Sequence, residues 1–320
     1  MVAVSARREI TEWHDAKTEV AERIIAEIEK GTVPWKREWN PEKCTGPQAP
    51  FNPVTKRSYR GINVLILGMS FLAFQSADPR WLTFLQAKEK GWRVKKGERS
   101  TTIFFTKDLN VKDDDAEDGE RTIRLLKQYP VFHASQIEGI PPYVPPTTDQ
   151  APWTRPEAVQ IIMQNSGVIF RSGGERAFYS PAGDFIQLPP DVAFPRQEYW
   201  AATAVHEINH STGHPTRMNR DLSGAFGSES YACEEARVEM AAAFVCNTLG
   251  LPTDFTNHAA YIATWLKKLK AEKYELFRCA ADAQRIADWT LAYHPECAAQ
   301  SQPHRPDRQS EPTPREPLII

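Results

Sequence analysis

The sequence predicts an α+β protein of two domains, and three observations support this class. Apolar residues recur with helical spacing in both halves of the chain, and the spacing changes to the alternation of β-strands between residues 92 and 132. Prolines are dense from Pro141 to Pro156, which is typical of a boundary between domains. The 320 residues are enough for two hydrophobic cores. We therefore expect an N-terminal α+β domain over residues 9–143, a Pro-rich linker over 144–156, and a mostly helical domain with a small sheet over 157–297.

The N-terminal half should begin with a helix over about residues 9–31, because Val20, Ile24, Ile25 and Ile28 form one apolar stripe that Gly31 ends. Two more helical patterns and three short strands follow it. The residues from Asp113 to Glu120 include six acids and one glycine, which predicts a solvated loop. The expected helices cover about 61–77 and 81–91, and the expected strands cover 92–94, 101–105 and 129–132.

The C-terminal half is predicted to contain helices around two strands. A Pro-Ala-Gly turn should join strands over 177–179 and 185–188. Beyond about residue 298, Gln, Ser, Pro and Arg dominate, so we expect a disordered tail over 298–320. The expected helices cover about 157–166, 197–213, 229–249, 256–271 and 272–290.

Composition excludes several classes of protein. Apolar residues make up 41% and charged residues 25% of the chain, the balance of a soluble globular protein. No apolar run approaches the roughly 20 residues that span a bilayer, and the N-terminus lacks the apolar core of a secretory signal. The five cysteines are scattered without a C-x-x-C pair. We expect a cytoplasmic protein with reduced thiols and no membrane partner.

The stretch from His206 to His210 has the pattern H-E-x-x-H on a predicted helix. Residues four apart share one face of an α-helix, so both imidazoles can bind one Zn²⁺. Glu207 would lie beside that metal, where its carboxylate can take a proton from water during hydrolysis. Mn²⁺ or Co²⁺ can also occupy a site of this kind.

A catalytic zinc site needs a third protein ligand and one open position. His214 is one candidate, although Gly213 precedes it and is expected to end the helix. A metzincin-type ligand would fall at Thr216, so that class is excluded. The remaining candidates lie on the next predicted helix.

Glu235 and Glu239 are four residues apart and should share a face of that helix, and Glu234 is a weaker candidate. The pair resembles the second metal helix of gluzincin-like peptidases, in which the first acid binds zinc and the second orients a histidine ligand. The resemblance implies Glu235 as the ligand and Glu239 as the partner behind it. The reverse assignment stays open.

A basic and aromatic segment suggests a surface for nucleic acid. Between Arg80 and Lys107 there are eight lysines or arginines and only two acids, with five aromatic residues among them. Basic side chains neutralise phosphates and aromatic rings stack on unpaired bases, so the mixture suits a single strand. The alternative is that these aromatic residues belong to the core. Candidate contacts are Trp35, Lys56, Arg57, Tyr59, Arg60, Arg80, Trp81, Lys88, Arg93, Lys95 and Lys96.

Several ordered motifs run through both halves of the chain. The N-terminal half carries E-K-G-T-V-P-W from Glu29, Y-R-G-I-N-V-L from Tyr59 and P-R-W-L-T-F from Pro79. The C-terminal half carries H-E-I-N-H, R-M-N-R from Arg217 and Y-A-C-E-E from Tyr231. Together these motifs resemble the ArdC-type antirestriction proteins, whose N-terminal domain is shared with plasmid TraC primases. Between Glu235 and Glu239 the chain has Ala-Arg-Val, where the family pattern is more apolar.

The resemblance implies a single-stranded-DNA-binding domain followed by a zincin-like metallopeptidase domain. It also implies a plasmid- or phage-borne protein that protects incoming DNA, as in conjugation, from host restriction. Two alternatives remain open. In the first, the chain would be an intracellular metallopeptidase acting on a host protein, such as a restriction component. In the second, it would be a DNA-binding accessory protein whose metal is purely structural.

Overall fold

The computed structural model describes residues 17–31, 49–74, 76, 78–112, 120–144, 154–251, 253 and 259–301. The predicted helix is present over residues 17–29. Several predictions fall outside the described residues: the first part of that helix, Trp35, most of the acidic loop, most of the linker, and the tail beyond residue 301. No described helix is long and apolar enough to cross a membrane.

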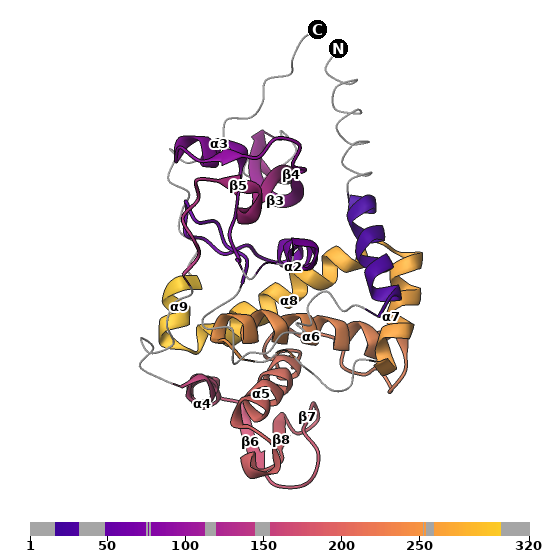
Figure 1. Ribbon diagram of the computed structural model, residues 1–320. Coiled ribbons are helices and arrows are strands. Elements are labelled where there is room, and N and C mark those ends of the chain that lie inside the picture. Colours follow the sequence, from indigo (N-terminus) through magenta and orange to yellow (C-terminus); the bar gives the residue numbers. More distant parts are fainter. Residues whose placement is uncertain are drawn as a thin grey trace.

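The N-terminal half combines helices with two antiparallel sheets (Figure 1). One sheet has the strand order β1-β4-β3, and the other pairs β2 with β5. The elements are α2 (Ile62–Phe74), β1 (Trp81–Leu82), α3 (Phe84–Glu89), β2 (Arg93–Val94), β3 (Thr101–Lys112), β4 (Glu120–His133), the 3-10 helix η2 (Ala134–Gln136) and β5 (Ile137–Glu138).

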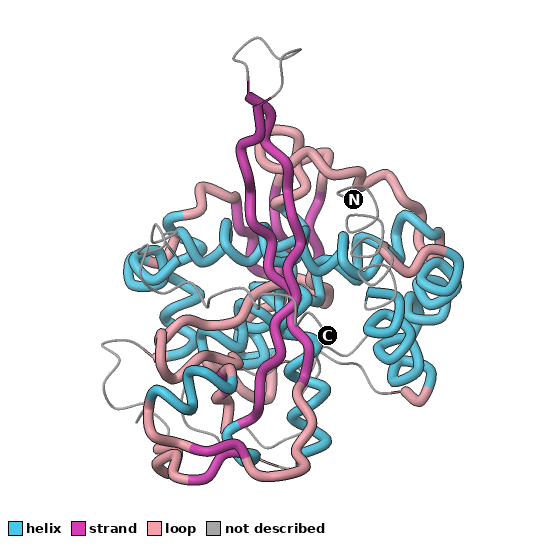
Figure 2. Tube along the Cα trace, turned by 90° about the horizontal axis from the view of Figure 1, so that it is seen from above, coloured by secondary structure: helices cyan, strands magenta, loops and turns pink. Residues whose placement is uncertain are grey.

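Strands β3 and β4 are much longer than the sequence indicates. Thr101 pairs with Val131, and the register continues to the pair of Lys112 with Glu120. Figure 2 shows the two strands as a twisted ribbon whose distal end extends away from the helices. The predicted strand ends at Phe105, whereas the backbone pairing with β4 continues through charged residues such as Lys107 and Asp108.

The C-terminal half places a three-stranded sheet beside a group of helices. The sheet has the order β6-β8-β7, with β6 parallel and β7 antiparallel to β8. The elements are α4 (Arg155–Asn165), β6 (Ile169–Ser172), β7 (Phe178–Ser180), β8 (Phe185–Leu188), the 3-10 helix η4 (Asp191–Ala193), α5 (Gln197–Ser211), α6 (Glu229–Leu249), α7 (Ala259–Ala271), α8 (Glu275–Ala292) and α9 (Pro295–Ser301). The predicted two-domain α+β class is confirmed. Strands β1, β5 and β6 and helix α9 were not predicted, and the predicted helix over 81–91 is wrong at its start, where Trp81 and Leu82 form β1.

Helix boundaries follow local capping chemistry. The Thr154 hydroxyl accepts from the Glu157 N–H while the Glu157 side chain accepts from the Thr154 N–H, a capping box that begins α4. Helix α6 starts after Ser228, whose side chain accepts from the Tyr231 N–H, and ends at Gly250 with a φ of 72°. These caps fix the register of α6, which supplies several acids to the candidate site.

The largest hydrophobic cluster contains residues from both halves of the chain. Ile24 of the first helix and Leu65 of α2 are buried in it together with residues of α6, α7 and α8. The rings of Phe104 and Phe277 meet edge to face with centroids 5.6 Å apart. Helix α2 contacts both β3 and α8, so the N-terminal sheet is held against the C-terminal helices.

Candidate metal centre

Helix α5 carries the H-E-x-x-H residues along its boundary with α6. Ala201, Ala204, Val205 and Ile208 are buried on α5, which fixes its rotation against the neighbouring helices. His206 and His210 therefore point to the same side, as their spacing predicts. Both side chains are largely covered, with relative exposures of 17% and 16%.

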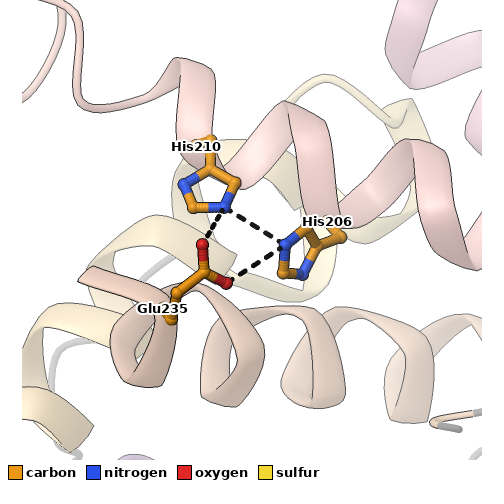
Figure 3. A group of neighbouring side chains, drawn as sticks. All are labelled: His206, His210 and Glu235. Carbon is orange, nitrogen blue, oxygen red and sulfur yellow. Dashed lines mark hydrogen bonds and ion pairs between the residues drawn. The ribbon is translucent and has the colours of Figure 1, made fainter. Parts of the chain in front are cut away.

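Three donor atoms converge at this point (Figure 3). The Nε2 atoms of His206 and His210 lie 3.1 Å apart. The Glu235 carboxylate reaches them from α6, with Oε2 3.7 Å from His206 Nε2 and Oε1 3.5 Å from His210 Nε2. Zinc bonds of 2.0–2.1 Å at tetrahedral angles place neighbouring donors about 3.3 Å apart. The three side chains therefore fit a divalent cation in both donor type and spacing.

Glu207 is buried beside these donors. Its side chain is 7% exposed, and its carboxylate accepts a hydrogen bond from the backbone N–H of Tyr179 in β7. Burial raises the pKa of Glu207 to about 7, partly opposed by the neighbouring His210. A carboxyl group with a pKa near neutrality can both accept and return a proton at physiological pH.

Two carboxylates surround the ring of His210. Burial alone would lower the pKa of His210, but hydrogen bonds to Glu234 and Glu235 raise it to about 10. Burial likewise works against ionisation of Glu234, yet hydrogen bonds from His210 and Arg220 lower its pKa to about 2. The pKa of Glu235 is lowered as well, since contacts with His210 and His206 outweigh its burial. Two ionised carboxylates thus face the His210 ring, and they favour a positive charge at this point.

The other candidate ligands have different surroundings. Among the described residues, only His206, His210 and Glu235 form a group whose donor atoms could hold one metal ion. Glu239 is buried and accepts a hydrogen bond from the Tyr261 hydroxyl of α7. His214 follows the end of α5 and contacts the Thr216 hydroxyl through Nδ1 at 2.8 Å. The structure does not bring Glu239 or His214 into this group.

Sequence reasoning missed three contributors to the site. Tyr231 makes a hydrogen bond to Glu235 through its hydroxyl, and Tyr179 contributes its backbone N–H to Glu207. Arg220 forms an ion pair with Glu234 at 2.7 Å. The motifs R-M-N-R and Y-A-C-E-E contain two of these residues, but only the tertiary fold shows what they contact.

The structure corrects three of the candidate DNA contacts. Trp81 is fully buried, and Tyr59 is 7% exposed and donates its hydroxyl to the Trp81 carbonyl at 3.0 Å. Arg80 is buried and donates two hydrogen bonds to the Asp78 carboxylate. All three side chains are buried in the N-terminal half, and those of Tyr59 and Arg80 are hydrogen-bonded there. The prediction that the three contact DNA is therefore wrong.

The other described candidates lie at the surface. Lys56, Arg57, Lys88, Lys95 and Lys96 are exposed. Arg93 is exposed but paired with Glu138 at 2.6 Å, and Arg60 forms an ion pair with Asp288 of α8. Of the five aromatic residues in the basic segment, Phe84 and Phe105 present large exposed rings, at 52% and 46%. The exposed set is therefore smaller and more basic than the sequence suggests.

Comparison with known proteins gives the family of the chain. Residues 14–132 match the N-terminal domain of the anti-restriction factor ArdC, and residues 157–282 match a zincin-like metallopeptidase domain. The crystal structure of metal-free antirestriction protein ArdC from plasmid R388 superposes with a TM-score of 0.73 at 33% identity, covering 88% of this chain and 98% of that one. The chain belongs to the ArdC family of antirestriction proteins.

Other ArdC relatives extend this result. A Mn(II)-bound structure of the R388 ArdC superposes with a TM-score of 0.71 at 34% identity, covering 89% of this chain and 99% of that chain. An uncharacterized protein of Sinorhizobium fredii, y4eC, is 34% identical over 285 residues, which cover 87% of this chain and 92% of y4eC. Two Escherichia coli DNA primases TraC are 39% and 38% identical over 86% of this chain. The chain spans only 27% and 20% of their lengths.

Proposed function

We propose that this ArdC-family chain protects incoming plasmid or phage DNA from host restriction by combining single-stranded-DNA binding with a metal-dependent hydrolase centre. The observation that carries the hydrolase part is the convergence of His206, His210 and Glu235 beside the buried Glu207. A site used only for structure has no need of a carboxyl group beside the metal ligands. The arrangement therefore favours catalysis.

His206, His210 and Glu235 would hold the cation, with Zn²⁺ as the first candidate because of the donor set. The Mn(II)-bound relative supports a divalent ion, so Mn²⁺ belongs in the same tests. When bound, the cation supplies Lewis acidity at the reacting carbonyl.

The chain's own residues perform the proton transfers. Glu207 accepts a proton from the attacking water and returns it to the leaving amine, a task for which its pKa of about 7 is suited. The N–H of Tyr179 holds the Glu207 carboxylate in place. The Tyr231 hydroxyl is hydrogen-bonded to Glu235 and orients that carboxylate. These contacts support peptide hydrolysis as the reaction class.

Single-stranded DNA is the proposed partner of the N-terminal half. Lys56, Arg57, Lys88, Lys95 and Lys96 offer exposed charges for phosphates, and Phe84 and Phe105 offer exposed rings for bases. The shared hydrophobic cluster keeps this half next to the candidate metal centre. DNA binding would therefore deliver the hydrolase centre to proteins that act on the same DNA.

The hydrolase part is tested by the variant Glu207→Gln in a host with an active restriction system. We expect Glu207→Gln to retain the bound metal, by elemental analysis, and to lose protection of unmodified incoming DNA. His206→Ala should lose both. Glu229→Gln is the matched control, because Glu229 lies on α6 six residues before Glu235 and pairs with Lys268 of α7. Full protection by Glu207→Gln would show that hydrolysis is dispensable for antirestriction.

The DNA part is tested with the double variant Lys95→Ala/Lys96→Ala. If both lysines contact phosphates, the slope of log affinity against log salt should fall by about 1.4, since each phosphate contact on a single strand contributes about 0.7. Lys267→Ala/Lys270→Ala on α7 is the charge-matched control and should keep the wild-type slope. Equal slopes for the two double variants would remove this lysine pair from the DNA surface.

A further inference from the structure

The ring of His210 lies between two consecutive glutamates of α6. Glu235 Oε1 is 3.5 Å from Nε2, and Glu234 Oε1 is 3.5 Å from Nδ1. The two ring nitrogens therefore face different carboxylates. A histidine that binds a cation through Nε2 must carry its proton on Nδ1, and an acceptor at Nδ1 selects that tautomer.

Glu234 is held by a second, stronger interaction with Arg220. The guanidinium donates to both carboxylate oxygens, with Nε 3.0 Å from Oε2 and Nη2 2.7 Å from Oε1. Side-chain exposures are 12% for Arg220 and 8% for Glu234. A bidentate pair of this kind fixes the plane of the carboxylate. It also occupies both oxygens, so Glu234 is placed to orient His210 and not to bind the cation itself.

Arg220 is in turn fixed to the end of the histidine helix. Its Nη1 lies 2.6 Å from the Thr212 hydroxyl, and its Nη2 lies 3.0 Å from the Asn209 carbonyl. The chain reaches this position by a tight turn after α5, in which the Arg220 N–H donates to the Gly213 carbonyl at 2.9 Å. Asn219 adopts a left-handed backbone with a φ of 48° within that turn. Arg220 thus connects the C-terminal end of α5 to α6.

The charges of the cluster explain why this connection matters. Glu207, Glu234 and Glu235 are three carboxyl groups around two imidazoles in a largely buried volume. Arg220 compensates the charge of Glu234 and holds it against Nδ1, which leaves Glu235 as the carboxylate that faces both Nε2 atoms. Without Arg220, Glu234 would lose the bidentate partner that fixes the plane of its carboxylate, and the His210 ring would be held less firmly.

We infer that Arg220 and Glu234 act as a positioning pair, in which Arg220 fixes Glu234 and Glu234 fixes the ring and tautomer of His210 for divalent-cation binding. The inference rests on the proposed metal centre and assigns the orienting role to Glu234, where the sequence comparison with gluzincins pointed to Glu239. It predicts that Arg220 influences metal affinity mainly through Glu234, with a smaller contribution from its contacts to the end of α5.

The test is titration of the full-length protein with Mn²⁺, following free Mn²⁺ by electron paramagnetic resonance. Glu234→Gln should bind Mn²⁺ about tenfold or more weakly, because partners behind metal ligands typically contribute 10–100-fold to affinity. Arg220→Gln should weaken binding in the wild-type background and have a much smaller effect in the Glu234→Gln background. Glu229→Gln, on the same helix, should bind as the wild type does.

Thermal unfolding in EDTA separates this role from a structural one. If Arg220→Gln lowers the melting temperature but leaves Mn²⁺ affinity within twofold of wild type, the pair only stabilises the fold and the inference is overturned. If Glu234→Gln does not fold, Arg220→Lys replaces it, since lysine keeps the charge but loses the bidentate geometry. Wild-type affinity in Arg220→Lys would overturn the inference equally.

The proposed metal centre has a separate outcome. If His206→Ala abolishes Mn²⁺ binding while Glu234→Gln leaves it unchanged, the centre stands and the positioning pair fails. If the wild-type protein binds no Mn²⁺, the proposed function and the positioning pair fail together.

Discussion

Asn63 should be among the most important polar residues for the stability of this protein. Its side chain is 3% exposed and pairs with the backbone of Phe104 on the free edge of β3. Nδ2 donates to the Phe104 carbonyl at 2.7 Å, and Oδ1 accepts from the Phe104 N–H at 2.8 Å. The amide therefore replaces a missing neighbouring strand and satisfies both backbone groups.

The variant Asn63→Ala leaves those two buried groups without partners. Each unsatisfied buried group costs about 1–3 kcal/mol, so we expect a loss of about 3 kcal/mol, allowing for some entry of water. Asn63→Asp should be at least as damaging near neutral pH, because a carboxylate would face the Phe104 carbonyl. Part of the loss should be regained in acid, where the aspartate is protonated and can donate.

Urea unfolding followed by circular dichroism measures these losses. Asn165→Ala is the control, since Asn165 makes a similar amide-to-carbonyl bond to Tyr293 but at the surface. That control should lose less than about 1 kcal/mol. If Asn63→Ala loses no more than the control does, the edge of β3 is satisfied in another way and the reasoning is wrong.

Three further predictions concern the candidate site, each measured by urea unfolding in EDTA. Tyr261→Phe should cost about 1–3 kcal/mol, because it takes a donor from the buried carboxylate of Glu239; no loss would show that the carboxylate is satisfied without it. Gly224→Ala should cost about 1–3 kcal/mol, since a Cβ would lie 2.6 Å from the backbone N of Tyr231; an unchanged midpoint would mean that the loop shifts freely. Burial raises the pKa of Glu207 to about 7, so the folded chain keeps a proton that the unfolded chain releases above pH 4.5. From pH 4.5 to 7 the wild type should therefore lose stability relative to Glu207→Gln, by up to about 1.4 kcal/mol per pH unit, and a constant difference would contradict this.

The parts of the site that were predictable from sequence depend on local geometry. His206, Glu207 and His210 occupy one short helix, and helical periodicity alone places the two imidazoles side by side. The caps of α6 could likewise be inferred from Ser228 and Gly250. In these cases the residues that interact are close in sequence, so the pattern contains the necessary information.

The DNA candidates show where a pattern of residue types is insufficient. Trp81 and Phe105 both belong to the basic and aromatic segment, yet Trp81 is fully buried and Phe105 is 46% exposed. Trp81 of β1 pairs with His133 of β4, and the two rings pack edge to face with centroids 4.9 Å apart. No local periodicity reveals this, because the partner lies 52 positions away in the numbering. The residue types of this segment thus do not indicate which of its rings are buried and which are exposed.

The choice between Glu235 and Glu239 illustrates the same limit within one helix. Residues four apart share a helical face, so the sequence makes them equivalent candidates. They lie one turn apart along α6, however, and packed helices generally cross at an angle, so successive turns meet different neighbours. At Glu235 the neighbour is α5 with its two imidazoles, and at Glu239 it is Tyr261 of α7.

The adjacent Glu234 reaches Nδ1 of His210 for a related reason. Consecutive residues of a helix point about 100° apart, so Glu234 and Glu235 can contact one ring from two sides. Which acid lies beside the two imidazoles is therefore decided by where α6 crosses its partners, and the spacing of the acids does not encode this crossing.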